Sequence, residues 1–225
     1  YISGRYSVLT EVGMVPAYLM GINISKIRKN LLNHLNNRNK KFLRNSSTNL
    51  ANILKNKKFK NLIFFNYIPQ LDKFLFWCQQ LIGESLGKKG NGFLPMISPA
   101  PKDHHSLLQL YLDGPKDKIF HIFSSEIKSN IKINSNIFGK KLNFLNNKSL
   151  SDIKMAQKNA FIKALKKKKI PFREFILKDL SEEVIGELFS YFIFETAIIG
   201  KLLNMNPFDQ PAVEQVKLSA KKVLA

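Results

Sequence analysis

The chain has 225 residues, of which 44% are hydrophobic and 18 are phenylalanines, and this composition predicts a folded globular protein rather than a disordered one. Its single cysteine, Cys78, excludes an intrachain disulfide framework and favours a reducing, cytoplasmic compartment. The net charge of +20 raises nucleic acid as a partner, but only five of the 36 basic residues are arginines, which are the better readers of phosphates and base edges. We therefore expect no nucleic-acid partner, although a basic nucleic-acid-binding protein stays open as a third interpretation.

The first part of the chain reads as helices. Residues 6–21 are apolar with small residues and predict a packed helix that is kinked near Pro16. Two amphipathic stretches, 25–35 and 46–54, each have a serine that can cap a helix start. The Asn-, Arg- and Lys-rich segment 36–45 between them is predicted to be a polar connector.

Strands and helices alternate in the rest of the chain. The predicted strands are short apolar or alternating runs at 61–67, 93–98, 118–124 and 171–177. The predicted helices are 70–87, one that begins at Asp103 or Ser106 and runs to Leu112, 150–168 and 181–205. Residues 125–148 show only a weak extended signal, at 131–137. This alternation predicts an α/β fold with a largely parallel sheet and helices on both faces, and in such sheets ligands bind beyond the carboxyl ends of the strands.

Helix 181–205 contains an apolar run at 188–194. Charged residues interrupt its surroundings at Glu187, Glu195 and Lys201, so we expect a core helix and no membrane span.

Gln80 and Glu84 lie four residues apart on the predicted helix 70–87 and so share one face. A carboxylate beside a carboxamide in apolar surroundings is a candidate general base. The alternative is an exposed glutamate near a helix end.

Two adjacent histidines, His104 and His105, stand at a predicted helix start. Neighbouring residues on a helix point about 100° apart, and no third ligand follows at a suitable spacing, so we expect no metal site. One histidine as a proton shuttle is the better functional interpretation.

An arginine follows a glycine in Ser3-Gly4-Arg5-Tyr6-Ser7. A guanidinium and a glycine backbone can approach an oxyanion together, so this segment is a candidate anion-stabilising element.

The segment 206–217 predicts a loop that runs into a helix with Pro211 at its first position and Asp209 or Gln210 as a cap. Glu214 and Lys217 are three residues apart and share a face. The segment is either the wall of a site for an anionic substrate or a capped surface helix with a salt bridge.

Four blocks of the sequence, taken together and in this order, resemble the glucose-6-phosphate isomerase (phosphoglucose isomerase) family. They are Ser3-Gly4-Arg5-Tyr6-Ser7, Trp77 to Lys88 (WCQQLIGESLGK), Asp103-His104-His105-Ser106, and Gly200 with Phe208 to Lys217 (FDQPAVEQVK). The resemblance extends over essentially the whole chain. It implies a three-layer α/β sandwich of the sugar-isomerase (SIS) type, flavodoxin-like, with a mainly parallel sheet and added C-terminal helices.

The same resemblance implies an aldose–ketose isomerase that interconverts glucose 6-phosphate and fructose 6-phosphate through a cis-enediol, without a cofactor or a metal. Glu84 would be the base and Arg5 would stabilise the enediolate charge, while His105 and Lys217 would assist ring opening. Gly4, Gln80 and Gln210 would bind the substrate, with Gln210 at its phosphate end. The chemistry needs a base, a cationic oxyanion partner and an acid–base pair at the ring oxygen.

The resemblance also implies a domain organisation. Residues 1–23 would connect to an N-terminal SIS domain, 24–205 would form the second SIS domain, and 206–225 would be the active-site loop and C-terminal helix. The chain would then be the C-terminal portion of the enzyme, without the family's upstream phosphate-binding loop. Ser3 departs from the family pattern, which has a second glycine there.

Finally, the family implies a cytoplasmic homodimer with shared active sites, in which the neighbouring subunit supplies the catalytic histidine, and a step of glycolysis and gluconeogenesis. No membrane partner is expected. A SIS-type module that binds sugar phosphates without catalysis is the main alternative.

Overall fold

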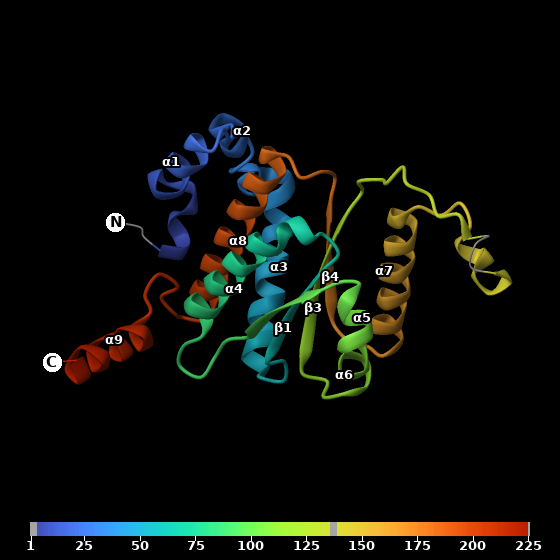
Figure 1. Cartoon of the computed structure of the whole chain (residues 1–225). Helices are drawn as coiled ribbons and strands as arrows, with labels where there is room; N and C mark the ends of the chain where they lie inside the picture. Colours follow the sequence, from blue (N-terminus) through green and yellow to red (C-terminus); the bar gives the residue numbers. More distant parts are fainter. Residues whose placement is uncertain (1–3, 136–138, 225) are drawn as a thin grey trace. The chain divides into compact units, whose positions relative to one another are not determined.

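The computed structural model describes residues 4–135 and 139–224 and divides into two compact units (Figure 1). Unit 1 takes in residues 1–60, 76–95 and 181–225, and unit 2 takes in residues 61–75 and 96–180. This division does not test the predicted domain boundaries near residues 23 and 205, which stay a prediction.

Unit 2 holds the sheet, apart from the first two residues of one strand. Four strands, β1 (Asn61–Asn66), β2 (Leu94–Pro99), β3 (Lys118–Ser125) and β4 (Phe172–Leu177), are arranged in the order β2-β1-β3-β4. β1 pairs in parallel with β3, and β3 pairs in parallel with β4. The predicted α/β class with a mainly parallel sheet is therefore confirmed, and the four predicted strands match these bounds within two residues.

The apolar core of unit 2 fills one face of this sheet. Alternate residues of β1 and β3, such as Ile63, Phe65, Phe120 and Ile122, share that face because successive side chains of a strand point to opposite sides. Helices α5 (Lys102–Ser106), α6 (Leu108–Asp113) and α7 (Leu150–Lys167) belong to the same unit. Residues Tyr111, Phe161, Ile162 and Leu165 of α6 and α7 pack into the core.

Unit 1 is helical. It begins with the 3₁₀ helix η1 (Gly4–Leu9), followed by α1 (Glu11–Leu19), α2 (Ile24–Lys29), η2 (Asn33–Leu35) and α3 (Asn37–Asn56). Most of α4 (Asp72–Leu86), which follows the short η3 (Pro69–Leu71), and all of α8 (Glu182–Leu202) and α9 (Pro211–Leu224) complete the unit. α8 lies beside α2 and α3 (Figure 1). At Gly186 the approach is so close that a Cβ atom would stand 1.9 Å from the carbonyl oxygen of Ile27.

The predictions for the first helices were partly wrong, and the predicted helix 6–21 is divided into η1 and α1. Residues 36–45 are not a connector, since α3 runs unbroken from Asn37 to Asn56 and the Asn36 side chain caps its start. Ser46 is therefore no cap. Its hydroxyl donates to the buried carboxylate of Glu195 at 2.7 Å, so a tertiary contact accounts for a polar residue inside the helix. The predicted helix 25–35 is split into α2, which Asn23 caps, and η2.

The segment between β2 and β3 forms two short helices rather than one. Asp103 lies inside α5, where its carboxylate accepts a hydrogen bond from Ser98 Oγ at 2.6 Å. Part of the weak extended signal at 131–137 falls outside the described residues. Its described part contributes the bridge between Lys132 and Ser149, and η5 (Lys140–Leu145) follows.

Among the helices of residues 4–135 and 139–224, none is long and apolar enough to cross a membrane.

Candidate active site

Arg5 lies at the centre of a polar cluster in unit 1. Gly4, at the start of η1, has a positive φ of +63°, which glycine adopts without strain, and the chain then turns Arg5 inward. Arg5 is only 4% exposed. Trp77 of α4 donates its indole N–H to the carbonyl oxygen of Arg5 at 2.8 Å, which fixes η1 against α4.

All five guanidinium N–H groups of Arg5 have acceptors. Nε donates to Ser85 Oγ at 2.8 Å, and Nη2 donates to the carbonyl oxygens of Pro207 and Asp209 at 2.7 and 3.0 Å. Nη1 donates to the Glu84 carboxylate at 2.9 Å and to the side-chain oxygen of Gln210. The planar fork therefore joins η1, α4 and the loop before α9, and only its Nη1 edge faces side chains from the predicted site.

Both oxygens of the Glu84 carboxylate are engaged. Oε2 accepts from Arg5, and Oε1 accepts from the amide of Gln80 at 3.2 Å. The side chain of Glu84 is 32% exposed, so the carboxylate lies at a surface that a small molecule can reach. The predicted neighbours Gln80 and Glu84 do share a face, and Arg5 and Gln210 meet them there.

The loop 206–210 is held from two sides. Lys88 donates from its ammonium group to the carbonyl oxygens of Asn206 and Asp209 and to the Asp209 carboxylate. The hydrogen bond from Lys88 lowers the pKa of Asp209 below its ordinary value. Pro207 packs so closely on Gly200 of α8 that a Cβ atom there would stand 2.9 Å from the proline ring.

A cavity of about 500 Å³ opens beside this cluster, and this volume suits a small metabolite. Its walls come from the end of α4, from the loop and from the start of α9, and they include Glu84, Lys88, Asp209, Gln210 and Pro211. Carboxylate, ammonium and carboxamide groups thus line one cavity within unit 1.

Lys217 lies apart from the Arg5 contacts. α9 begins at Pro211, as predicted, and Lys217 donates to Glu214 at 2.8 Å across one turn. Both side chains are more than half exposed. In this chain the segment therefore has the salt bridge of the alternative interpretation, while the role of Lys217 stays a prediction.

The two histidines have different surroundings in unit 2. His104 packs against Phe65 and Phe161, and its Nε2 lies 2.6 Å from the hydroxyl of Tyr67. Burial raises the pKa of Tyr67 and lowers the pKa of His104, so the hydrogen bond joins a neutral phenol and a neutral imidazole. His105, one residue on, is exposed. Of the pair, His105 is the more exposed.

Within the part of the chain that the structure describes, no three His, Cys, Asp or Glu side chains gather as a metal ion would require.

Ser85 and Lys88 were not predicted as site residues, although both hold the cluster together. Ser85 accepts from Arg5 and from the Tyr6 hydroxyl at 2.9 Å. No local pattern identifies Lys88, because its partners lie 118 and 121 residues away in the sequence.

The fold and the site define an α/β protein with a polar cavity, in which a guanidinium and one carboxamide hold a carboxylate and a second carboxamide accepts from the same guanidinium. Residues 1–225 match the model of the family described as "Phosphoglucose isomerase". The chain belongs to the phosphoglucose isomerase family.

Curated relatives agree with this assignment. The glucose-6-phosphate isomerase of Methanocaldococcus jannaschii is 33% identical over 225 residues, which are 96% of this chain and 54% of that protein. The glucose-6-phosphate isomerase of Mycoplasmopsis pulmonis is 37% identical over 237 residues, which cover 99% of this chain and 54% of that protein. The chain thus spans about half the length of the curated relatives it matches.

Solved structures share the fold. A hypothetical protein from Thermus thermophilus superposes with a TM-score of 0.85 at 25% identity, over 98% of this chain and 55% of that one. A glucose-6-phosphate isomerase from Chlamydia trachomatis superposes with a TM-score of 0.62 at 19% identity, over 74% of this chain and 35% of that one. At this identity the second likeness concerns the fold alone.

Proposed function

We propose that this chain is the C-terminal portion of an aldose–ketose isomerase that interconverts glucose 6-phosphate and fructose 6-phosphate through a cis-enediol. The observation that supports it best is the Glu84 carboxylate, which is held by Arg5 on one oxygen and by Gln80 on the other. An isomerisation of this class needs one positioned carboxylate next to one fixed cation.

Glu84 is proposed as the base. It takes the proton from C2 of the open-chain aldose, and the electrons of that C–H bond form the C1–C2 double bond while the negative charge moves to O1. A proton passes from O2 to O1, and Glu84 then returns its proton to C1, which leaves the ketone at C2. The proton that Glu84 takes from C2 is the one that it returns to C1. Substrate and product therefore have the same composition and oxidation level, and the step needs no oxidant or metal.

Arg5 is proposed to stabilise the charge on the enediolate oxygens. Its Nε and Nη2 groups are held by Ser85 and by backbone carbonyls, so the guanidinium needs little reorganisation during the reaction. A substrate oxygen would replace a side-chain partner on the Nη1 edge. Gln210, which shares that edge, would then turn to the phosphate end of the substrate, while Gln80 and the Gly4 backbone complete the binding site.

His105 and Lys217 are proposed to assist opening of the sugar ring. His105 is exposed, as a residue that serves the neighbouring subunit of a homodimer must be. Lys217 would exchange Glu214 for the ring oxygen of the substrate.

The chain spans 54% of the relative from Methanocaldococcus jannaschii. The phosphate group of the substrate is proposed to bind mainly to residues that correspond to the rest of that relative. The complete protein would work in the cytoplasm, in glycolysis and gluconeogenesis.

The experiment compares residues 1–225 alone with a full-length protein that carries them, assayed for isomerisation in deuterated water. We expect fructose 6-phosphate conversion with deuterium exchange in the full-length protein and none in residues 1–225 alone. Turnover close to that of the full-length protein by the 225-residue chain would contradict the shared-site proposal. Sugar-phosphate binding by the full-length protein without exchange or conversion would instead favour the non-catalytic SIS module.

A further inference from the structure

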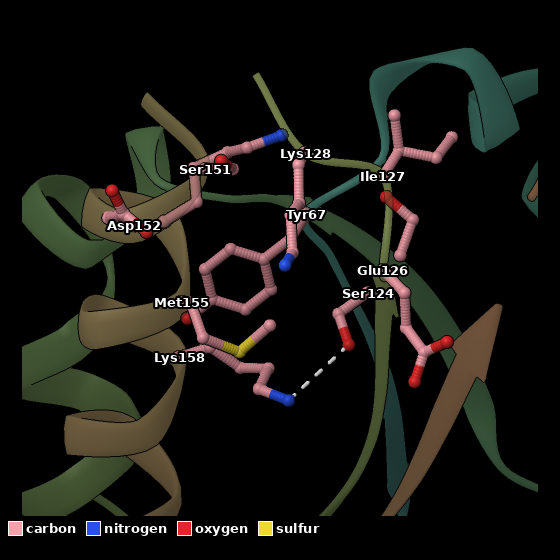
Figure 2. A pocket seen from close by; sticks show the side chains of 11 residues that line it. Tyr67, Ser124, Glu126, Ile127, Lys128, Ser151, Asp152, Met155 and Lys158 are labelled. Carbon is pink, nitrogen blue, oxygen red and sulfur yellow. Dashed lines mark hydrogen bonds between the residues drawn. The ribbon is translucent and has the colours of Figure 1, made fainter. Parts of the chain in front are cut away.

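A second cavity, of about 490 Å³, lies at the carboxyl ends of β1 and β3, against the first turns of α7 (Figure 2). All its lining residues belong to unit 2, whereas those of the cavity beside Glu84 belong to unit 1. Nothing in the isomerase mechanism uses this second cavity. Its position follows the rule that parallel sheets bind ligands beyond the carboxyl ends of their strands.

The cavity lies next to the apolar core of unit 2, where polar side chains follow the apolar ones. On β3, Ser124 follows Phe120 and Ile122 on the same face of the sheet. On α7, Lys158 precedes Ile162 by four residues, so it points to the same side as that core residue. The core therefore ends in a hydroxyl and an ammonium group that face the cavity, as Figure 2 shows.

Lys158 is buried to an unusual degree for a lysine, with a side chain only 6% exposed. Its ammonium group donates to Glu174 at 3.3 Å and to Ser124 Oγ at 3.5 Å, which are long hydrogen bonds. A buried ammonium is stable only when its N–H groups are well satisfied. An anionic oxygen in the cavity would supply a shorter bond than either of these partners.

Basic side chains and the start of a helix lie around the cavity. Lys128 and Lys154 also line it, and α7 directs its N-terminal dipole toward it. The carboxylate of Asp152 is engaged by the backbone and hydroxyl of Ser149 in the capping box of α7. Among the charged lining residues Lys128, Lys154 and Lys158 stand against Glu126 and Asp152, and Glu174, which pairs with Lys158, does not line the cavity.

We propose that this cavity binds a small organic anion. A phosphate or carboxylate group accepts hydrogen bonds from Lys158 and Ser124, and the carbon skeleton packs against Tyr67 and Met155. The volume fits a metabolite of modest size, because small-molecule pockets measure about 300–1,000 Å³.

Methionine methyl groups provide a reporter in each cavity, since Met155 lines this one and Met205 lines the candidate active site. The 225-residue chain, labelled with ¹³C at its methionine methyls, is titrated with inorganic phosphate and, separately, with malonate. We expect a saturable shift of the Met155 signal with one or both anions, at a dissociation constant in about the millimolar range. The anion that binds more tightly identifies the phosphate or the carboxylate class.

Lys158→Gln should weaken the affinity reported by Met155 about tenfold or more, because a charge-assisted hydrogen bond is lost. Lys163→Gln, at an exposed position of the same helix, is the matched control and should leave the affinity unchanged. Ser124→Ala provides a second test if Lys158→Gln does not fold. A Met155 signal that moves with neither anion, or that moves equally in Lys158→Gln or Ser124→Ala, would overturn the proposal. The Met205 signal reports the other cavity separately.

Discussion

Arg5 Nη1 donates to Glu84 Oε2 at 2.9 Å, and this bond joins two residues 79 positions apart in the sequence. Arg5 is almost completely buried, while Glu84 is about one-third exposed. The cation is therefore fixed by the protein, and the carboxylate presents itself at the wall of a cavity. A base that must move a proton along a substrate needs this combination of a fixed neighbour and an accessible oxygen.

Glu84→Gln in the full-length protein should abolish isomerisation and leave substrate binding largely intact. The amide is nearly the same size as the carboxylate but cannot accept a proton. The expected loss in kcat is about 10²–10⁴-fold, the usual contribution of a general base. Coupled isomerase assays and a binding titration with fructose 6-phosphate measure the two quantities separately.

Glu183→Gln is the matched control, since Glu183 has a similar side-chain exposure of 30% and pairs with Lys29, which is not a residue of the candidate site. It should retain the activity of the parent protein. Substantial activity in Glu84→Gln would mean that Glu84 is not the base.

Much of the fold could be predicted from the sequence because its strands are short apolar runs bounded by turn residues. The strand at 61–66 and the helix at 150–167 follow directly from local patterns. The break predicted at 36–45 failed because its Asn, Arg and Lys residues suit an exposed helix face as well as a loop. The contact from Ser46 to Glu195, 149 residues away, cannot be seen in any local window.

The site divides in the same way. The pair Gln80 and Glu84 could be found from helical spacing alone. Arg5 and Gln210 joined them only through the family resemblance, because the loop that carries Gln210 is far from both in sequence. Lys88 was missed since its partners, two backbone carbonyls and the Asp209 carboxylate, lie 118 and 121 residues away in the sequence.

Arg5→Lys should destabilise unit 1. A lysine has three N–H donors and lacks the planar fork, so it cannot serve Ser85, Pro207 and Asp209 together. The free energy of unfolding of the 225-residue chain should fall by roughly 2–4 kcal/mol, because several buried acceptors lose their donor. Urea denaturation measures this change. Arg28→Lys, at an exposed position of α2, should change it by no more than about 0.5 kcal/mol.

His104→Asn should lower the stability of the chain, whereas His105→Asn should lower the activity of the full-length protein. His104 loses its contacts with Phe65 and Phe161 and its bond to Tyr67, so the free energy of unfolding should fall by about 2–3 kcal/mol. His105 is exposed, and its replacement should change stability by no more than about 0.5 kcal/mol. In the full-length protein His105→Asn should nevertheless slow isomerisation. Unchanged turnover in His105→Asn would remove it from the proposed ring-opening step.

Acidification should destabilise the chain below the ordinary histidine pKa of 6.5. Burial lowers the pKa of His34, His104 and His121, and for His121 the Arg173 charge lowers it further. In each case the unfolded chain binds the proton more tightly than the folded one. The stability from the neutral side chains is therefore complete above pH 6.5 and is lost as the pH falls toward the lower folded-state values. Urea midpoints between pH 5 and 8 test this, and a midpoint that rises on acidification would contradict it.

Lys217→Met separates a surface ion pair from a catalytic role. Lys217 and Glu214 are more than half exposed, so loss of their pair should change the free energy of unfolding by no more than about 0.5 kcal/mol. If Lys217 turns to the ring oxygen of the substrate, the full-length variant should lose about 10²-fold or more in kcat. The loss in kcat should be greater when the substrate is the cyclic sugar than when it is the open-chain sugar, because only ring opening requires Lys217.

Glu214→Gln is the counterpart of that variant, since it breaks the same ion pair and leaves the lysine free. Its activity should equal or exceed that of the parent protein, because Lys217 no longer has to leave a carboxylate to reach the substrate. Equal small effects of Lys217→Met and Glu214→Gln on turnover would show that the pair is only a surface salt bridge. A large loss confined to Lys217→Met would identify the lysine as part of the ring-opening machinery.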